Sequence, residues 1–418
     1  MKTYLPLLFI FCILLSSSLY AESITYEKYN SFTPEKKQKL IKKYVKRSGQ
    51  YHKIKIGTYT VYSDVNPANA IEKGIIMDEY FRKFSSLFNG KFRIGKSPDL
   101  FILKNNDSYE IAIATFFNQP REKENSIGTF ASFGSKKALF ANNEGKKEDV
   151  MATLYHEGTH QLLDAYIKRD IPTWFDEGSA ENFETWEMTR SLKNNLANSL
   201  YRSQRGLWIP DIYPNKGFVK FSKLIHMSQK SFYQPSQSNN CYRSAWASIH
   251  YFLYTKSSRN IYNKLINCYK SGKKQSSLLS TKAIENIEKK INLHIESIII
   301  PHHRYVVPAI EAMKKKNYKI ALLSIKKMKQ LHPLSQTANF YMAWISILMG
   351  DLKANHLKTI IQLQSKKYQH PEINFAIAQC YYLTKGNNWK SKAKSFATKA
   401  IKANWKHKEA KNILKELK

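Results

Sequence analysis

Residues 154–163 have the sequence LYHEGTHQLL, and this stretch decides what the chain around it must build. His156 and His160 are four residues apart, so on a helix their side chains face the same side, with Cβ atoms about 5–6 Å apart. Two imidazoles at that separation can bind one tetrahedral Zn²⁺, and Glu157 between them can act as general base for a zinc-activated water. The stretch therefore predicts a helix that carries part of a hydrolytic site with one zinc ion (Zn2+) per chain.

A second stretch, PTWFDEGSAENFE at residues 172–184, follows after a turn and predicts another helix that returns against the first. Glu177 can supply the third zinc ligand, which leaves the fourth position for water, as in catalytic sites and unlike closed structural sites. Glu181 lies one helical turn later on the same face. From there its carboxylate can accept the outer N–H of a ligating histidine, for which we favour His156, and so fix the orientation of that ring.

The combination of HEGTHQL and PxWFxEGxAE resembles the gluzincin metallopeptidases, which bind zinc through HExxH and a downstream glutamate. Over residues 55–270 the chain is similar to a bacterial family named domain of unknown function 1570. The resemblance implies a thermolysin-like metallopeptidase domain of α+β class, with a small mixed sheet and a helical subdomain. It also implies that Tyr242 on a later helix stabilises the oxyanion, although a tyrosine that only packs at a helix start is the alternative. The GxMEN motif of the aminopeptidase branch is absent, which favours an endopeptidase.

The first 21 residues have the organisation of a signal peptide. Lys2 precedes the apolar run from Leu5 to Leu15, and Ala21 provides a small residue at the cleavage point. We therefore predict export, either to a periplasm or out of the cell. No later apolar run is long enough to cross a membrane, so no transmembrane segment is expected in the mature chain.

The order of patterns along the chain predicts the remaining domains. Residues 22–50 are rich in lysine and predict a basic helical lead segment. Residues 51–300 are expected to form the metallopeptidase-like domain, with alternating strands before the zinc-binding helix and helices after it. We expect residues 138–141 to be an edge strand, to which a peptide substrate can add as an antiparallel strand.

Residues 305–418 show a repeated pattern of paired helices. Gly350 and Gly386 are 36 residues apart, and Pro333 and Pro371 are 38 apart, which are periods typical of helix-pair repeats. The pattern resembles tetratricopeptide repeats, while an ordinary helical bundle is the alternative. The repeats imply an all-α domain that recruits a protein partner or substrate.

The sequence also gives expectations for two cysteines and three histidines outside the zinc motifs. Cys241 and Cys268 lie on two expected helices joined by a short turn, whose antiparallel packing would bring them near enough for a disulfide in an oxidising compartment. Two free buried thiols are equally compatible with the pattern. His250 is expected in the core. His302 and His303 are expected in a loop between two domains, with metal binding as the alternative.

The chain has a formal net charge of +35, which favours anionic partners such as an anionic surface, although the lysines are dispersed without a tight cluster. Export and the lack of an aromatic-basic motif count against a nucleic-acid or polyanion binder, so no nucleic-acid partner is expected. A catalytically silent zinc-containing protein, whose repeats mediate protein–protein interaction, is the alternative and would not need Glu157. We therefore expect an exported zinc peptidase that hydrolyses peptide or protein substrates recruited by its repeats.

Overall fold

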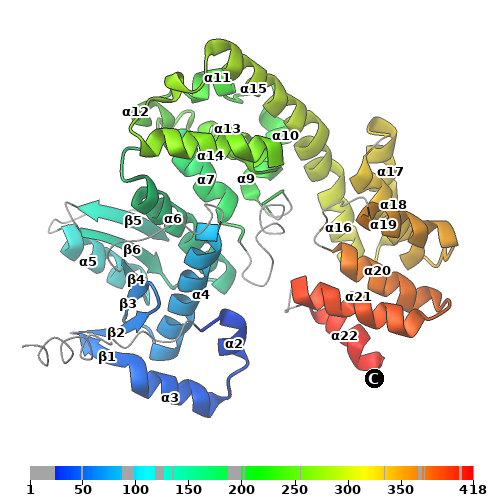
Figure 1. Ribbon diagram of the computed structural model, residues 1–418, viewed down its shortest axis with the longest axis horizontal. Coiled ribbons are helices and arrows are strands. Elements are labelled where there is room, and N and C mark those ends of the chain that lie inside the picture. The colour runs from blue at the N-terminus through cyan, green and yellow to red at the C-terminus, as the bar shows by residue number, and fades with distance from the viewer. Residues whose placement is uncertain are drawn as a thin grey trace, which may run out of the picture. The chain divides into compact units, whose positions relative to one another are not determined.

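The computed structural model divides the chain into two compact units, Met1–Leu162 and Leu163–Lys418 (Figure 1). The residues that it describes are 24–48, 50–86, 98–117, 127–133, 136–186, 199–200, 203–254, 256–333, 335–365, 370, 372–403 and 407–417. The predicted signal peptide, residues 1–21, lies outside them. No helix among the described residues is both long enough and apolar enough to cross a membrane. The division into units falls inside helix α6 (Lys147–Ile167), and the domain limits inferred from the sequence remain predictions.

The first unit is built on one mixed sheet of six strands in the order β1-β2-β3-β4-β6-β5. Strands β1, β2 and β3 form antiparallel pairs, β3, β4 and β6 run parallel, and β5 returns antiparallel to β6. The small mixed sheet expected from the sequence is therefore confirmed. The strands are β1 Val45–Ser48, β2 Tyr51–Ile56, β3 Tyr59–Ser63, β4 Asp99–Leu103, β5 Gly128–Phe133 and β6 Lys136–Asn142.

The sheet ends at β5, so the prediction that residues 138–141 form the edge strand is wrong. Those residues lie in β6, which pairs with β4 on one side and with β5 on the other. Their side chains are fully buried, as expected for an interior strand that pairs on both sides. Sequence reasoning missed β5 because GTFASF carries only a weak strand pattern.

The lead segment before the sheet is helical only in part. It forms α2 (Tyr26–Asn30) and α3 (Pro34–Tyr44), after which Val45 takes extended backbone angles of φ −86° and ψ 126°. Val45 then pairs with Ile54 and starts β1. The prediction of a helical segment is therefore wrong for its last residues, because these residues complete the outer edge of the sheet.

Helices α4 (Pro67–Ser86) and α5 (Asn106–Phe117) pack on the sheet, α4 against β2 and β3 and α5 against β4 and β6. Helix α6 packs in turn on α4, where the hydroxyls of Tyr80 and Thr159 share a hydrogen bond of 2.7 Å. Gly158 permits this approach, because a Cβ atom there would lie 2.6 Å from Cε of Met77. These contacts hold the helix of the HEGTH motif in place and leave its two histidines half-buried.

The regular elements described in the second unit are all helices. Helix α13 packs against both α7 and α14. Gly178 allows α7 and α13 to come close, because a Cβ atom there would lie 2.7 Å from the carbonyl oxygen of Ala245. The elements up to residue 294 are α7 Thr173–Phe183, α9 Gln204–Leu207, α10 Ile209–Ile212, α11 Phe221–Leu224, α12 Gln229–Phe232, α13 Ser238–Tyr254, α14 Lys256–Lys270, the 3-10 helix η1 Gln275–Ser277 and α15 Thr281–His294.

The chain continues from α15 to the C-terminal helices without the predicted loop. Two π-helical segments, η2 (Ile295–Ile299) and η3 (His302–Val306), lead directly into α16. His302 and His303 are buried there, so their assignment to a loop is wrong. The wider π-helical turns carry the helix past Pro301, which would interrupt an ordinary α-helix. His250 is buried in α13, which confirms the expected core position.

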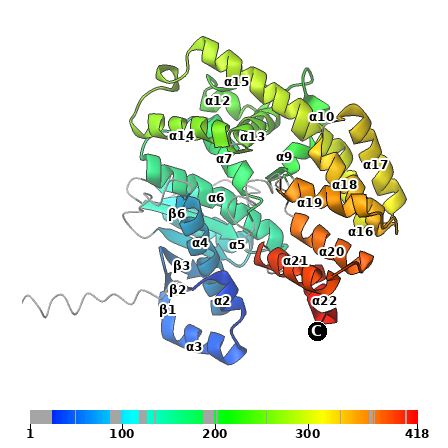
Figure 2. The same ribbon diagram turned by 45° about the vertical axis from the view of Figure 1, so that its right-hand side comes forward.

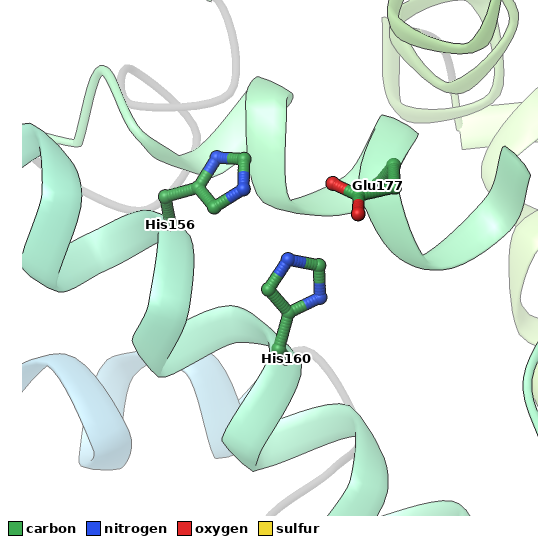
Figure 3. Close-up of side chains that lie close together, drawn as sticks. All are labelled: His156, His160 and Glu177. Atoms are coloured by element: carbon green, nitrogen blue, oxygen red, sulfur yellow. The ribbon is translucent and has the colours of Figure 1, made fainter. Parts of the chain in front are cut away.

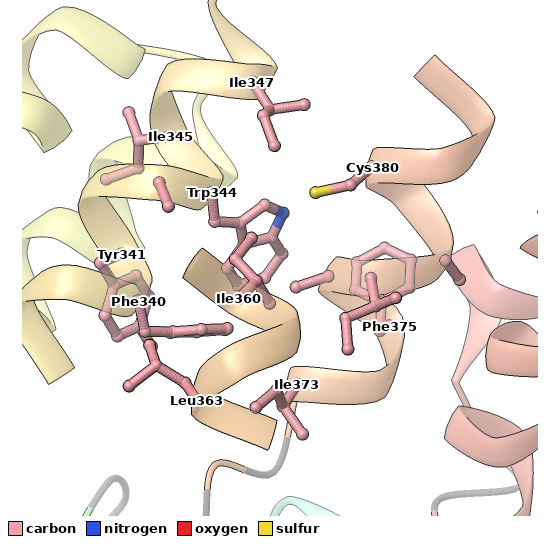
Figure 4. Close-up of a cluster of buried hydrophobic side chains, with 14 of the residues drawn as sticks. Phe340, Tyr341, Trp344, Ile345, Ile347, Ile360, Leu363, Ile373, Phe375 and Cys380 are labelled. Carbon is pink, nitrogen blue, oxygen red and sulfur yellow. The ribbon is translucent and has the colours of Figure 1, made fainter. Parts of the chain in front are cut away.

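From Val307 onward the described chain consists of helices, each packed against the next, and Figure 2 shows them in succession. Alternate helices α18, α20 and α22 also touch. Their shared core contains Phe340 and Trp344 of α18 together with Ile360 and Phe375 (Figure 4). This packing suits helix pairs, while a tetratricopeptide identity remains a prediction. The helices are α16 Val307–Lys314, α17 Tyr318–Leu331, α18 Gln336–Leu348, α19 Ala354–Ser365, α20 Ile373–Thr384, α21 Trp389–Ala403 and α22 Lys408–Glu416.

The two cysteines considered for a disulfide are free thiols, so the bridge is not formed. Sγ of Cys241 lies 3.5 Å from Sδ of Met227. Sγ of Cys268 donates instead toward the carbonyl oxygens of Lys273 and Lys274, each at 3.4 Å. The helices pair as expected. Of the two alternatives left open by the sequence, a disulfide or two free buried thiols, the structure has the free thiols, because the two side chains point into different surroundings.

Candidate metal centre

The candidate site is carried by α6 and α7, and the local sequence explains where these helices begin and end. Glu148 and Asp149 lie in the first turn of α6, where acidic side chains stabilise the positive end of the helix dipole. After the last residue of α6, Lys168 takes a left-handed conformation with φ 58°, which ends the helix. The chain then turns through residues 168–172, and Pro172 precedes the first residue of α7.

The three predicted zinc ligands lie together. His156, His160 and Glu177 each offer one ligand atom, and these atoms all lie within 4.8 Å of one another. Figure 3 shows the two imidazoles on successive turns of α6 and the carboxylate of α7 directed toward the same space. Glu177 is buried, whereas the two histidines are half-buried. Two imidazole nitrogens and one carboxylate oxygen form a donor set that suits Zn²⁺, so the residues fit the expected ion.

Glu157, the predicted general base, is held by the edge of the sheet. Its Oε2 atom accepts a hydrogen bond of 2.7 Å from the backbone N–H of Phe130 in β5. That N–H points away from β6, so the edge strand contributes a donor to the site. The side chain of Glu157 is half-buried and one position from His156.

Glu181, predicted to orient a histidine, lies beside the first ligand. His156, Glu181 and Glu184 form a second group whose ligand atoms lie within 4.8 Å of one another. Oε1 of Glu181 also accepts a hydrogen bond of 2.8 Å from Nη2 of Arg205, which lies on α9. Burial lowers the pKa of the Arg205 guanidinium, but the hydrogen bond and charge of Glu181 outweigh burial and raise the pKa overall. The buried carboxylate is thus paired with a guanidinium that stays charged.

Tyr242 lies at the same site, together with a tyrosine that the sequence analysis did not single out. The hydroxyl of Tyr233 donates to Oε1 of Glu177 at 2.5 Å. The rings of Tyr233 and Tyr242 lie 6.3 Å apart, and the guanidinium of Arg205 lies 4.8 Å from the centre of the Tyr242 ring. Burial, followed by the negative charge of Glu177, raises the pKa of both phenols. Both hydroxyls therefore remain protonated at neutral pH and can donate hydrogen bonds.

Sequence reasoning missed Tyr233 and Arg205 for a physical reason. Each lies in or beside a helix of four residues, α12 and α9, which is too short to show a hydrophobic period. Neither belongs to a motif with fixed spacing to the HEGTH stretch. Only the tertiary packing of these short helices against α7 and α13 brings the two side chains to the site.

With this geometry established, the chain can be compared with known protein families. Residues 150–274 match the family described as protein of unknown function, DUF1570. This is the bacterial family named in the sequence analysis, and the matched segment includes α6 from Val150, all of α7, and Arg205, Tyr233 and Tyr242. No curated protein and no solved structure matches the chain. Because the description of the family assigns no activity, the function must be argued from the site.

Proposed function

We propose that this protein is an exported zinc metallopeptidase of the gluzincin type, and specifically an endopeptidase. The observation that carries the proposal is the grouping of His156, His160 and Glu177 within 4.8 Å, next to a glutamate held by a backbone N–H. Catalytic zinc sites use three such protein ligands and keep one position open. A zinc ion bound here would supply the Lewis acidity that peptide hydrolysis requires.

Glu157 acts as the general base in this proposal. The N–H of Phe130 holds Oε2, which leaves Oε1 to take a proton from the attacking water and to pass it to the leaving amine. A carboxylate fixed in this way needs little reorientation during the reaction. Its position next to His156 in the sequence keeps it beside the ligands without making it one of them.

The two tyrosines take different parts. Tyr233 bonds to Glu177, so it holds the carboxylate ligand in place. Tyr242 is proposed to donate to the oxyanion that develops on the scissile carbonyl, a role that a neutral phenol can perform. Glu181, held by Arg205, orients the ring of His156.

Substrate binding in the proposal follows a thermolysin-like arrangement. Strand β5 lies at one edge of the sheet and its Phe130 contacts Glu157, so an extended peptide that adds to β5 would pass the general base. A substrate bound as an added strand can continue past the general base at both of its ends, which suits cleavage within a polypeptide chain. The helices from α16 to α22 would recruit protein substrates through their extended surface.

The proposal is tested by incubating the purified protein with a proteome-derived peptide library, with and without a chelator. We expect internal cleavage that the chelator abolishes and added zinc restores. Zinc binding without cleavage of any peptide would favour the alternative, a catalytically silent zinc-containing protein whose helical repeats bind protein partners.

A further inference from the structure

A groove distinct from the proposed zinc ligands lies at the start of α7, in the second unit. Its volume is about 610 Å³. Three segments line it: the link before α7, the residues between α11 and α12, and the loop that follows α14. The residues that line the groove do not include the proposed zinc ligands. The groove therefore needs an explanation apart from the metal centre.

Three cationic side chains gather along this groove. The guanidinium of Arg169 lies against Gly272, because a Cβ atom on Gly272 would be 2.9 Å from Nη1 of that arginine. Gly272 also has φ +71°, so a glycine serves both the turn and the close approach. Lys273 and Lys274 follow directly in the same loop, while Asp170 lines the groove with the opposite charge.

The loop that presents the lysines is fixed by side chains. Cys268 donates toward the carbonyl oxygens of both lysines, at 3.4 Å each. Tyr269 OH donates to Oε1 of Gln275 at 2.9 Å, and Nε2 of Gln275 donates across to the carbonyl oxygen of Ile225. The loop after α14 is thus tied to the segment that follows α11, so the lysine backbone positions are set before any ligand arrives.

Asp170 offsets only part of the positive charge that Arg169, Lys273 and Lys274 bring to the groove. Within the residues that the structure describes, Arg169, Lys273 and Lys274 form no ion pair. Cations held near one another repel, and a bound anion would relieve that repulsion. Arginine pairs with the two oxygens of a carboxylate or phosphate, and lysine adds a point charge. The groove therefore suits a ligand that carries oxyanions.

The rest of the lining favours a peptide over a small ion. Met227 is half-buried and supplies apolar surface, and the exposed Ser276 supplies a neutral hydrogen-bonding group that suits a peptide backbone. Ile225 and Tyr269 lie beneath them as buried residues, and the amide of Gln275 is already bonded to both. A groove of this volume is far larger than a single oxyanion requires, but it accommodates several residues of an extended chain. The mixture of cations, apolar surface and amide-binding groups points to a polypeptide with acidic side chains.

We propose that this groove binds an acidic peptide segment. The carboxylates of the segment pair with Arg169, Lys273 and Lys274, while an apolar side chain contacts Met227. The inference does not rest on the proposed peptidase activity, because binding in this groove requires neither zinc nor hydrolysis.

The experiment measures fluorescence anisotropy of a labelled peptide of alternating Glu and Leu on the full chain, with a chelator present so that no hydrolysis interferes. A peptide with Gln in place of each Glu is the control ligand. The variant Arg169→Gln/Lys273→Gln/Lys274→Gln should bind the acidic peptide at least about tenfold more weakly, because three ion pairs to the peptide are lost together. These side chains are exposed, so the variant should unfold at the wild-type temperature.

A charge-matched variant separates this groove from the general charge of the protein. Lys319→Gln/Lys326→Gln/Lys327→Gln removes three exposed cations from α17 and should change affinity by less than about twofold at physiological salt, because such distant charges are screened. Gly272→Ala leaves the charge unchanged but displaces Arg169. It should therefore weaken binding of the acidic peptide and leave binding of the Gln control peptide unchanged. Equal losses in the two triple variants would overturn the proposal. So would equal binding of the Glu and Gln peptides, or displacement of the acidic peptide by inorganic phosphate at concentrations similar to those of unlabelled peptide.

Discussion

The molecule contains two groups of histidines with opposite surroundings, and the first is the candidate metal centre. His156 and His160 are half-buried, and the carboxylates of Glu177 and Glu181 are within reach of them. The negative charges would offset that of a bound cation, and one ring nitrogen of each histidine lies within 4.8 Å of the other and of a Glu177 oxygen. The side chains of this group are close enough together to bind a metal ion.

The second group consists of His250, His294, His302 and His303, all buried in the second unit. Nδ1 of His250 lies 2.9 Å from Nε2 of His294, and the ring of His250 stacks on Trp246. Burial lowers the pKa of His294 to about 3 and that of His303 to about 4. Among the described residues, these four do not belong to a group of three ligand atoms within 4.8 Å.

The difference shows that histidine content alone does not make a metal site. Imidazoles that lie among aromatic rings are kept neutral by desolvation and serve as core side chains. Imidazoles that converge beside buried carboxylates are placed for a cation. The environment decides the role of each group. Helix α7 supplies the carboxylates near the first group, and α13, α15 and η3 carry the second group.

Substitution of a proposed zinc ligand should give the largest difference in zinc content between variants of the two histidine groups. His156→Ala, His160→Ala and Glu177→Ala should each reduce the zinc content from about one per chain to near zero after dialysis, because two protein ligands do not retain the ion. His294→Gln removes a histidine from the second group and should leave the zinc content unchanged. If all three ligand variants keep stoichiometric zinc, the ligand assignment is wrong.

Acidification should act on the second group. An imidazole whose pKa is lowered on folding binds fewer protons folded than unfolded, so stability is lost as pH falls below the unfolded value of about 6.5. For His303 the loss should reach about 3 kcal/mol near pH 4, since each pKa unit corresponds to about 1.4 kcal/mol. Urea unfolding of metal-free protein at several pH values measures it. His303→Gln should lose less stability on acidification than the wild type, and parallel losses would contradict the neutral, buried state of His303.

Tyr233→Phe should have a smaller effect, confined to the first group. Without its hydroxyl, Glu177 loses the hydrogen bond that holds it, and zinc affinity should fall about 10–100-fold, as for other partners of metal ligands. Competition with a fluorescent zinc chelator measures the affinity directly. Tyr242→Phe is the comparison variant. Its hydroxyl also interacts with Glu177, as the smaller of its effects, so zinc affinity should fall less than in Tyr233→Phe while hydrolysis slows. If Tyr233→Phe binds zinc as tightly as the wild type, the hydroxyl does not position the ligand.

The parts of the site that could be predicted from sequence are those that depend on helical spacing. One helix fixes the spacing of His156, Glu157 and His160, and the next fixes Glu177 and Glu181. A single turn between the two helices was therefore enough to predict that the two motifs face each other. The turn and both helices are present as predicted.

The rest depends on contacts between segments distant in sequence. Arg205 and Tyr233 reach the site from short helices without a periodic pattern. Strand β5 takes the edge position because it pairs with β6, whose other side is already paired with β4. Cys241 and Cys268 show the same limit, because helix pairing can be foreseen but the direction of each thiol cannot.

The central claim is that this chain is a zinc peptidase with Glu157 as its base, and Glu157→Gln tests it most directly. The amide cannot accept the proton, so peptide hydrolysis should fall by about 10²–10⁴-fold. Zinc content and unfolding temperature should remain those of the wild type, because Glu157 is not a ligand and its neighbour Phe130 can still donate to the amide oxygen. Loss of hydrolysis with zinc retained is the predicted result. Wild-type turnover by this variant would contradict the account.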